Sequence, residues 1–323
     1  MAFYDHKHVT QALVAWQAVR CQIADMTALA RANRTSKDWL PWYDRTGRVS
    51  LLRLAVFVLA SGPALWMTYK WFGGLLSPKP ITDILRESGD WSIRLLLVTL
   101  AVSPLRALTR WNGILAVRRM LGLFALFYGL LHLSFYFFDQ HFVLWRIALE
   151  IVLRTYLTIG FSALLIMAVM GATSTDAMVR RLGAEKWRRI HWWVYVAVFG
   201  GLLHFFMQVR IKAYEPSLLT GLCILLGGYR LLQRRSRDVP YWQLVALALA
   251  GFAGAALMEA AYYAISMNAP MLVVLQANLD FSYEIRPAYW SLAAGVLLIV
   301  TKAAGQLRNR FTGRSRSAQV AAE

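Results

Sequence analysis

The sequence predicts an all-α protein, a multi-spanning bundle of transmembrane helices. Of its 323 residues, 58% are apolar and only 16% carry a charge, whereas about 25% of the residues of an average soluble domain are charged. The apolar residues fall in blocks of roughly 17 to 25, the length at which a helix crosses a hydrocarbon core of about 30 Å. Backbone groups in lipid must be hydrogen-bonded internally, which favours helices.

Eight blocks are long enough to be spans, and a polar segment precedes the first. We therefore divide the chain into an N-terminal segment at 1–48, six spans within 49–232, two additional spans within 233–306 and a basic tail at 307–323. The expected spans are 49–72, 91–107, 118–138, 147–172, 188–209, 216–232, 241–266 and 288–305.

The distribution of Lys and Arg predicts the orientation. With the N-terminus in the cytoplasm, the inside segments hold 25 of these residues and the outside loops hold six. Positive residues accumulate on the cytoplasmic side of membrane proteins, so both termini are expected there. This bias accounts for the net charge of +18 without nucleic acid, and the basic loops would lie against anionic lipid headgroups. The two cysteines, Cys21 and Cys223, support no disulfide framework.

Three of the six histidines, His132, His191 and His204, lie in or at the edge of expected spans. An imidazole in lipid is costly and usually faces the bundle interior with a partner or a cofactor. At about 1.5 Å per residue, His132 lies roughly 20 Å and His204 roughly 22 Å above the inner boundary of the membrane. This shared level predicts one b-type haem with these two histidines as axial ligands.

His191 lies only about 3 Å above the same boundary. On the third span, the residue 14 positions before His132 is Arg118 and not a histidine, so the inner pair is incomplete. His191 is a candidate ligand of a second haem, with Met120 or water as its partner, or a residue that lines a flavin or quinol site. The competing interpretation is that the histidines only form hydrogen bonds within the bundle. A transition-metal site is disfavoured because no carboxylate or thiolate lies near the outer pair.

The histidines are embedded in strings that resemble one family. These strings are GDWSIRLLLVTL at 89–100, SPLR at 103–106, RRMLGL at 118–123, LH at 131–132, RLG at 181–183, WRRIH at 187–191, LH at 203–204, EP at 215–216 and GYR at 228–230. In this combination the sequence resembles the MsrQ family (also called YedZ), haem-binding membrane subunits of the ferric-reductase-like superfamily. The resemblance implies a six-helix haem-binding domain at 49–232, to which this chain adds two C-terminal spans.

The resemblance also implies a function in the bacterial inner membrane. A protein of this family accepts electrons from a cytoplasmic flavin reductase or from quinol. It passes them to a periplasmic molybdopterin enzyme that reduces methionine sulfoxide in oxidised envelope proteins. The haem histidines of the family fall on His132, His191 and His204, and the family is associated with flavin mononucleotide (FMN).

Two arginines near the outer ends of spans are candidate partners of a haem propionate, Arg154 and Arg94. A guanidinium donates charge-assisted hydrogen bonds to carboxylates. An arginine that extends to the headgroups is an equally good interpretation of either residue. Where the family commonly has Arg-Pro-Tyr at the start of the fourth span, this chain has Arg154, Thr155 and Tyr156, which keeps the cation and the phenol.

Two other functions remain open. No Gly-x-Gly-x-x-Gly loop after a strand and no soluble stretch of domain size is present for a dehydrogenase module, so we expect an electron-transfer subunit rather than a stand-alone enzyme. The first alternative is a ferric-reductase-like cytochrome b that serves another periplasmic acceptor, which the two added spans favour. The second is a transporter or scaffold without haem, for which Glu259 is the candidate buried carboxylate.

Overall fold

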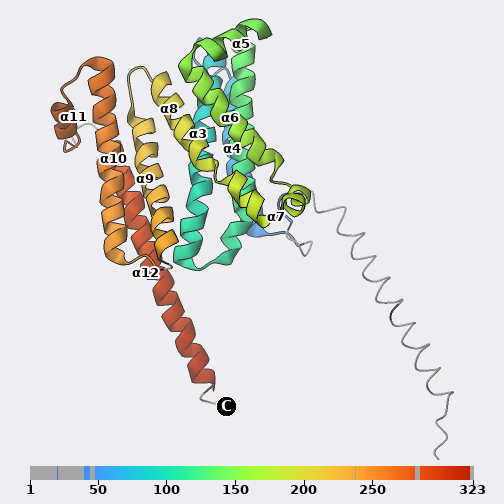
Figure 1. Ribbon diagram of the computed structural model, residues 1–323, viewed down its shortest axis with the longest axis vertical. Helices are drawn as coiled ribbons and strands as arrows, with labels where there is room; N and C mark the ends of the chain where they lie inside the picture. Colours follow the sequence, from blue (N-terminus) through green and yellow to red (C-terminus); the bar gives the residue numbers. More distant parts are fainter. Residues whose placement is uncertain (1–19, 21–39, 44–47, 237, 281–283, 321–323) are drawn as a thin grey trace, which may run out of the picture. The chain divides into compact units, whose positions relative to one another are not determined.

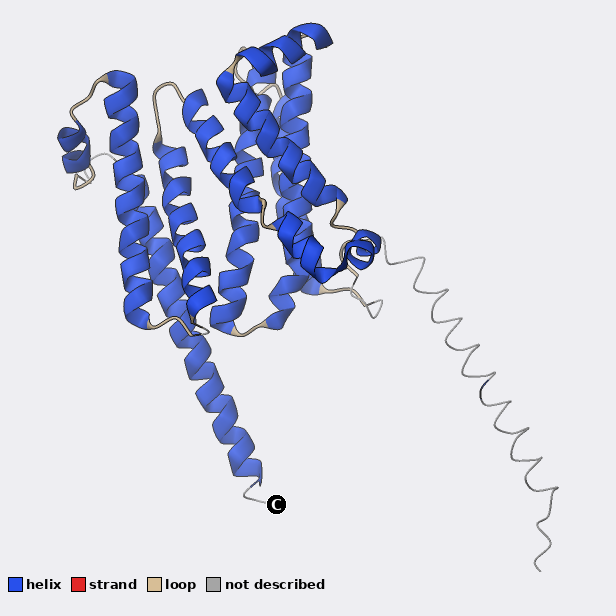
Figure 2. Ribbon diagram, viewed as in Figure 1, coloured by secondary structure: helices blue, strands red, loops and turns tan. Residues whose placement is uncertain are grey.

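The computed structural model describes residues 20, 40–43, 48–236, 238–280 and 284–320, and these form helices and no β-strand (Figures 1 and 2). The chain divides into two compact units, Met1–Leu59 and Ala60–Glu323. The N-terminal segment expected at 1–48 lies almost entirely outside the described residues.

In the first unit, the residues before helix α2 (Leu51–Phe72) fold back onto its first turns. The backbone N–H of Ser50 donates to the carbonyl of Trp42 at 2.9 Å. The Trp42 ring packs edge-on against Phe57, with ring centroids 5.3 Å apart. The start of this apolar helix is therefore held by the residues that directly precede it.

The second unit holds the other helices. They are α3 (Pro80–Thr109), α4 (Leu115–Asp139), α5 (Leu144–Leu153), α6 (Thr155–Ala172), α7 (Asp176–His191), α8 (Val194–Gln208), α9 (Tyr214–Arg235), α10 (Tyr241–Met267), α11 (Met271–Ala277) and α12 (Pro287–Val320). Helix α3 packs mainly against α4, α6 packs against α8, and α9, α10 and α12 pack against one another (Figure 1).

Seven stretches of the described residues are long and apolar enough to cross a membrane. They correspond to seven of the eight expected spans. The expected span at 216–232 is helix α9, which is not among the seven. Its apolar run is interrupted by Tyr229 and Arg230. Helix α9 is nevertheless packed into the bundle, where Leu225 and Tyr229 are buried.

The span expected at 147–172 is two helices rather than one. Helix α5 ends at Leu153, Arg154 has an extended backbone (φ −103°, ψ 106°), and α6 begins at Thr155. The sequence does not indicate this break, because apolar residues resume directly after it and the whole block has the length of one span. On α5 only Ile147 is buried, while Trp145 remains 74% exposed. A short helix with an exposed tryptophan is typical of the membrane interface.

The span expected at 188–209 is also divided. Its apolar helix, α8, begins only at Val194, after a turn at Trp192 and Trp193. The preceding helix α7 is polar and is kinked at Gly183, whose φ of 76° suits a residue without Cβ. His191 is therefore the last residue of α7 and not part of the helix that carries His204.

The span expected at 288–305 is the first part of a longer helix, because α12 continues to Val320. Lys302 attaches this helix to the loop between α9 and α10. Its ammonium group donates to the carbonyl of Val239 and lies 2.9 Å from a carboxylate oxygen of Asp238. The side of the membrane on which the termini lie stays a prediction.

Tyr128 of α4 contributes to the hydrogen bonding of α2. This residue is fully buried, and its hydroxyl donates to the carbonyl of Ala60 at 2.8 Å and accepts from the N–H of Ala64 at 2.9 Å. In an uninterrupted helix these two backbone groups bond to each other. The hydroxyl thus bonds to both backbone groups at one turn of α2, beside Pro63.

Candidate functional site: a histidine pair and an arginine-lined cavity

His132 of α4 and His204 of α8 face each other. Their ring centroids are 6.2 Å apart and their planes make an angle of 84°. Two imidazoles on opposite sides of one metal ion, with bonds of about 2.0–2.1 Å, have ring centres roughly 6 Å apart. The pair therefore has the spacing of two axial ligands. The structure brings together the two histidines that the helical rise places at one level, while their role as ligands stays a prediction.

Each imidazole is hydrogen-bonded to the backbone of a neighbouring helix. Nδ1 of His132 donates to the carbonyl of Leu85 at 2.7 Å, and Nδ1 of His204 donates to the carbonyl of Tyr156 at 2.8 Å. A carbonyl oxygen only accepts, so Nδ1 carries the proton in both rings. This leaves Nε2 of each ring as the nitrogen that can bind a metal ion, the arrangement usual for histidine ligands.

A glycine lies against each ring. A Cβ at Gly89 would lie 2.9 Å from Nδ1 of His132, and a Cβ at Gly160 would lie 2.6 Å from Nδ1 of His204. Neither position has room for a side chain. Sequence reasoning gave these glycines no role. The signal in the sequence is a glycine at a position where a helix is expected. Glycine there costs about 1 kcal/mol relative to alanine, which indicates a reason for its presence.

This donor set fits a haem iron better than a metal ion bound by protein alone. Within the part of the chain that the structure describes, no group of three or more His, Cys, Asp or Glu residues could hold a metal ion. Two imidazoles suffice for an iron whose remaining ligands come from a porphyrin. The residues present therefore fit a bis-histidine haem.

Arg94 is engaged within the bundle. Its guanidinium makes two bonds to the carboxylate of Glu215, at 2.5 and 2.7 Å. Its central carbon lies 5.0 Å from the centre of the Trp91 ring. This bidentate pair joins α3 to α9, and such pairs are among the stronger side-chain contacts. Arg94 is therefore a link between helices.

Arg154 lies at the break between α5 and α6. Its guanidinium donates to the hydroxyl of Tyr156 at 3.1 Å and lies 3.5 Å from a carboxylate oxygen of Glu150. Tyr136 donates to the other oxygen of this carboxylate at 2.9 Å. The hydrogen bond from Tyr136, together with the charge of Arg154, holds the pKa of Glu150 below its usual range. The carbonyl of Tyr156 accepts the hydrogen bond from His204. Arg154 is therefore two residues from the backbone group that holds this ring.

His191 is not part of the pair. Its ring stacks on Trp187, with centroids 3.9 Å apart and planes at 25°. Nδ1 lies 3.1 Å from the carbonyl of Trp187, and Nε2 lies 3.2 Å from the hydroxyl oxygen of Ser174. Both ring nitrogens thus have polar neighbours from the protein.

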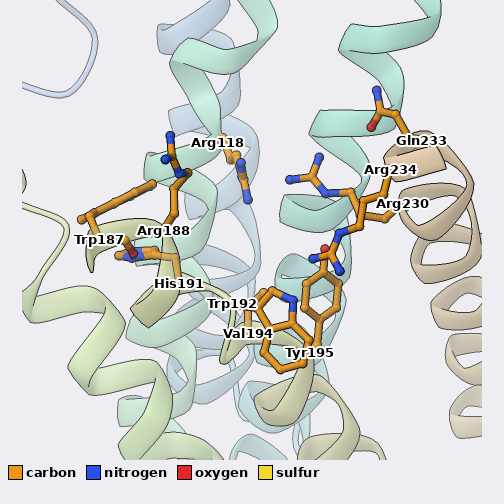
Figure 3. Close-up of a pocket in the computed structure, with 10 residues that line it drawn as sticks. All are labelled: Arg118, Trp187, Arg188, His191, Trp192, Val194, Tyr195, Arg230, Gln233 and Arg234. Carbon is orange, nitrogen blue, oxygen red and sulfur yellow. The ribbon is translucent and has the colours of Figure 1, made fainter. Parts of the chain in front are cut away.

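His191 lines a cavity of about 600 Å³ into which arginines from three helices point (Figure 3). Among the described residues, no acidic side chain lines it, and Met120, considered as a partner of His191, does not line it either. The aromatic side chains there offer flat faces for stacking. The arginines are Arg118 of α4, Arg188 of α7 and Arg230 and Arg234 of α9, and the aromatic residues are Trp187, Trp192 and Tyr195. The cavity therefore suits an anionic ligand with a flat ring.

Glu259 lies apart from both histidine sites. It is a buried residue of α10, and one carboxylate oxygen lies 3.7 Å from a guanidinium nitrogen of Arg286. The pair ties α10 to the residues directly before α12.

Comparison with known proteins identifies the family. Residues 88–202 match the model of the ferric reductase like transmembrane component. A protein of Rhodospirillum rubrum is 41% identical over 202 residues, which cover 61% of this chain and 95% of the relative. A protein of Herminiimonas arsenicoxydans is 34% identical over 197 residues, or 59% of this chain and 90% of the relative. Both are named protein-methionine-sulfoxide reductase heme-binding subunit MsrQ. The chain belongs to the MsrQ family.

Membership of the MsrQ family confirms the resemblance seen in the sequence strings. With the seven apolar stretches, it also identifies a multi-pass membrane protein, consistent with the bacterial inner membrane. The matched regions leave well over a third of this MsrQ-family chain without a counterpart in these relatives. No solved structure matches the chain.

Proposed function

We propose that this protein is a b-type cytochrome subunit that carries electrons across the membrane. The observation that carries the proposal is the pair of His132 and His204, with rings 6.2 Å apart and Nδ1 of each bonded to a carbonyl. The names of the relatives support it, because they are heme-binding subunits. A haem bound at this pair supplies one-electron redox chemistry.

The protein's own part is to hold the two imidazoles. The hydrogen bond at each Nδ1 fixes the ring and makes the other nitrogen more basic. His132 lies about 10 Å from the end of α4 at Asp139, and His204 about 6 Å from the end of α8 at Gln208. With the N-terminus in the cytoplasm, both ends are periplasmic. The pair is then close to the side on which a periplasmic acceptor docks.

The acceptor we favour is a periplasmic molybdopterin enzyme that reduces protein methionine sulfoxide. The names of the relatives support this choice, since they are heme-binding subunits of a protein-methionine-sulfoxide reductase. A ferric-reductase-like cytochrome with another acceptor is the second candidate. The observation that favours it is the addition of α10, α11 and α12, which lie outside the proposed haem-binding domain at 49–232.

Electrons enter, in this proposal, at the cavity beside His191. Its volume of about 600 Å³ is in the usual range for small-molecule sites. Arg118, Arg230 and Arg234 suit a phosphate or carboxylates, which favours FMN or the propionates of a second haem over an uncharged quinol. A cytochrome of this kind would then be reduced by a cytoplasmic flavin reductase. For His191 to bind iron, Nε2 would have to leave the hydroxyl of Ser174.

Two finer assignments belong to the same proposal. Arg154 is a candidate propionate partner at the outer site, supported by its position two residues before Tyr156. Residues 49–232 form the haem-binding domain and 233–306 an addition to it, although the cavity extends past this boundary to Arg234.

The test is a reduced-minus-oxidised absorption spectrum with haem quantification on the purified protein. His132→Ala and His204→Ala should each abolish the outer b-type signal. His141→Ala is the matched control, because His141 is exposed in the turn after α4. A wild-type protein that stays colourless after haem supplementation would contradict the proposal and favour a transporter or scaffold.

A further inference from the structure

Two helices that carry none of the three candidate ligands support the two that carry the outer pair, and they do so in the same way. On α3, Gly89 lies against His132 of α4, and on α6, Gly160 lies against His204 of α8. The carbonyl that accepts from the imidazole belongs to Leu85 in the first case and to Tyr156 in the second, each four positions before the glycine. The histidine follows that carbonyl by 47 residues in the first case and by 48 in the second.

This spacing has a physical reason. In an α-helix a carbonyl accepts from the N–H four residues later, which is here the N–H of the glycine. The second lone pair of the same oxygen is free for the imidazole. To reach it, the ring must pass over the glycine. A Cβ at Gly89 would lie 3.1 Å from Cε1 of His132, and one at Gly160 would lie 2.9 Å from Cε1 of His204.

The two contacts together fix the rotation of each ring. The hydrogen bond holds Nδ1, and the ring lies against the glycine in the space that a Cβ would fill. Helices α3 and α6 each hold one ring, and the planes of His132 and His204 make an angle of 84°. In a low-spin ferric haem, axial imidazole planes that are nearly perpendicular give a highly anisotropic electron paramagnetic resonance (EPR) signal. Nearly parallel planes give a rhombic one.

We propose that Gly89 and Gly160 are positioning residues that set the planes of the two axial imidazoles. This inference rests on the haem site proposed above and adds to it two residues that touch no iron. The absence of a side chain at these two positions is what admits each ring to its carbonyl.

The test compares Gly89→Ala and Gly160→Ala with Gly62→Ala and Gly227→Ala. The last two are control glycines in helices, at which a Cβ would have nothing within 4 Å. Wild type and controls should show the same highly anisotropic EPR signal. The two test variants should move this signal towards the rhombic form, shift the midpoint potential and lower bound haem. Gly160→Ala should have the larger effect because its contact is closer.

A second experiment applies even where a test variant folds poorly. In His132→Gly supplied with free imidazole, the ring is not attached to α4 and can move away from a new methyl group. Adding Gly89→Ala to this background should then change the spectrum and the haem content much less than in wild type.

The outcomes separate the two proposals. A wild-type protein without haem overturns the proposed function. A haem-loaded wild type whose EPR signal is unchanged in both Gly89→Ala and Gly160→Ala overturns only the role of the glycines. An equal effect of Gly89→Ala with and without the His132 side chain overturns it as well.

Discussion

The outer and inner histidine sites differ in what surrounds each imidazole. At the outer site two rings lie next to each other, each with Nδ1 on a backbone carbonyl and Nε2 without a hydrogen bond to the described protein. At the inner site the single ring of His191 stacks on Trp187, and both of its nitrogens have protein neighbours. The first arrangement suits a metal ion held between two helices. The second, with arginines around it, suits an anion.

A short turn between two helices produces this difference. His191 ends the polar helix α7, and the turn at Trp192 and Trp193 separates it from the apolar helix that carries His204. Two histidines of one expected span therefore lie in different environments. Residue type and spacing alone do not assign their roles.

The largest expected difference is between His204→Ala and His191→Ala. The first removes one of the two proposed ligands and should abolish the outer haem signal. The second should leave that signal at full strength, because His191 makes no contact with the outer pair. Haem-to-protein ratios and reduced-minus-oxidised spectra of both variants measure this. Loss of the outer signal in His191→Ala would mean that the two sites do not form independently.

The next prediction concerns the charge of the cavity. Replacing both Arg230 and Arg234 by Gln should weaken FMN binding by about 10²- to 10⁴-fold, since each hydrogen bond to a charged group contributes about 1.5–3 kcal/mol. Riboflavin, which lacks the phosphate, should be much less affected. Titration of the purified protein with both flavins measures the difference.

Arg189→Gln is the control for this experiment, because Arg189 is 79% exposed and pairs with Glu185 on the same helix. Unchanged FMN affinity in the double variant would contradict an anion site at the arginines. Equal loss for FMN and riboflavin would indicate a disturbed fold instead.

The smallest effect is expected from the two outer arginines. Arg94→Gln breaks the bidentate pair with Glu215 and should lower stability by about 1–2 kcal/mol without changing the haem spectrum. Arg154→Gln should leave stability nearly unchanged, because exposed ion pairs contribute about 0–1 kcal/mol, but should shift the haem midpoint potential. Thermal unfolding and potentiometric titration test both variants. The reverse pattern would assign the propionate contact to Arg94.

The sequence predicts most of the helices and the level of the histidines, for a simple reason. Apolar length and helical rise are properties of one helix at a time, so they place His132 and His204 without knowledge of their neighbours. The contacts of Gly89 and Gly160 depend on how two helices are rotated against each other, which no single-helix property determines. The break at Arg154 is not predicted for another reason, since apolar residues resume directly after it and the whole block has the length of one span.

The hydroxyl of Tyr128 between Ala60 and Ala64 implies an order of assembly. Lipid offers no hydrogen-bond partner, so while α2 is alone in the bilayer these two backbone groups must bond to each other. They gain the hydroxyl of Tyr128 as a further partner only when α4 packs against α2. The hydrogen bonds to Tyr128 therefore form when α2 packs against α4 and not when α2 enters the membrane. Tyr128 is one helical turn from His132, so the helix that carries this histidine also supplies the hydrogen bonds to the first span.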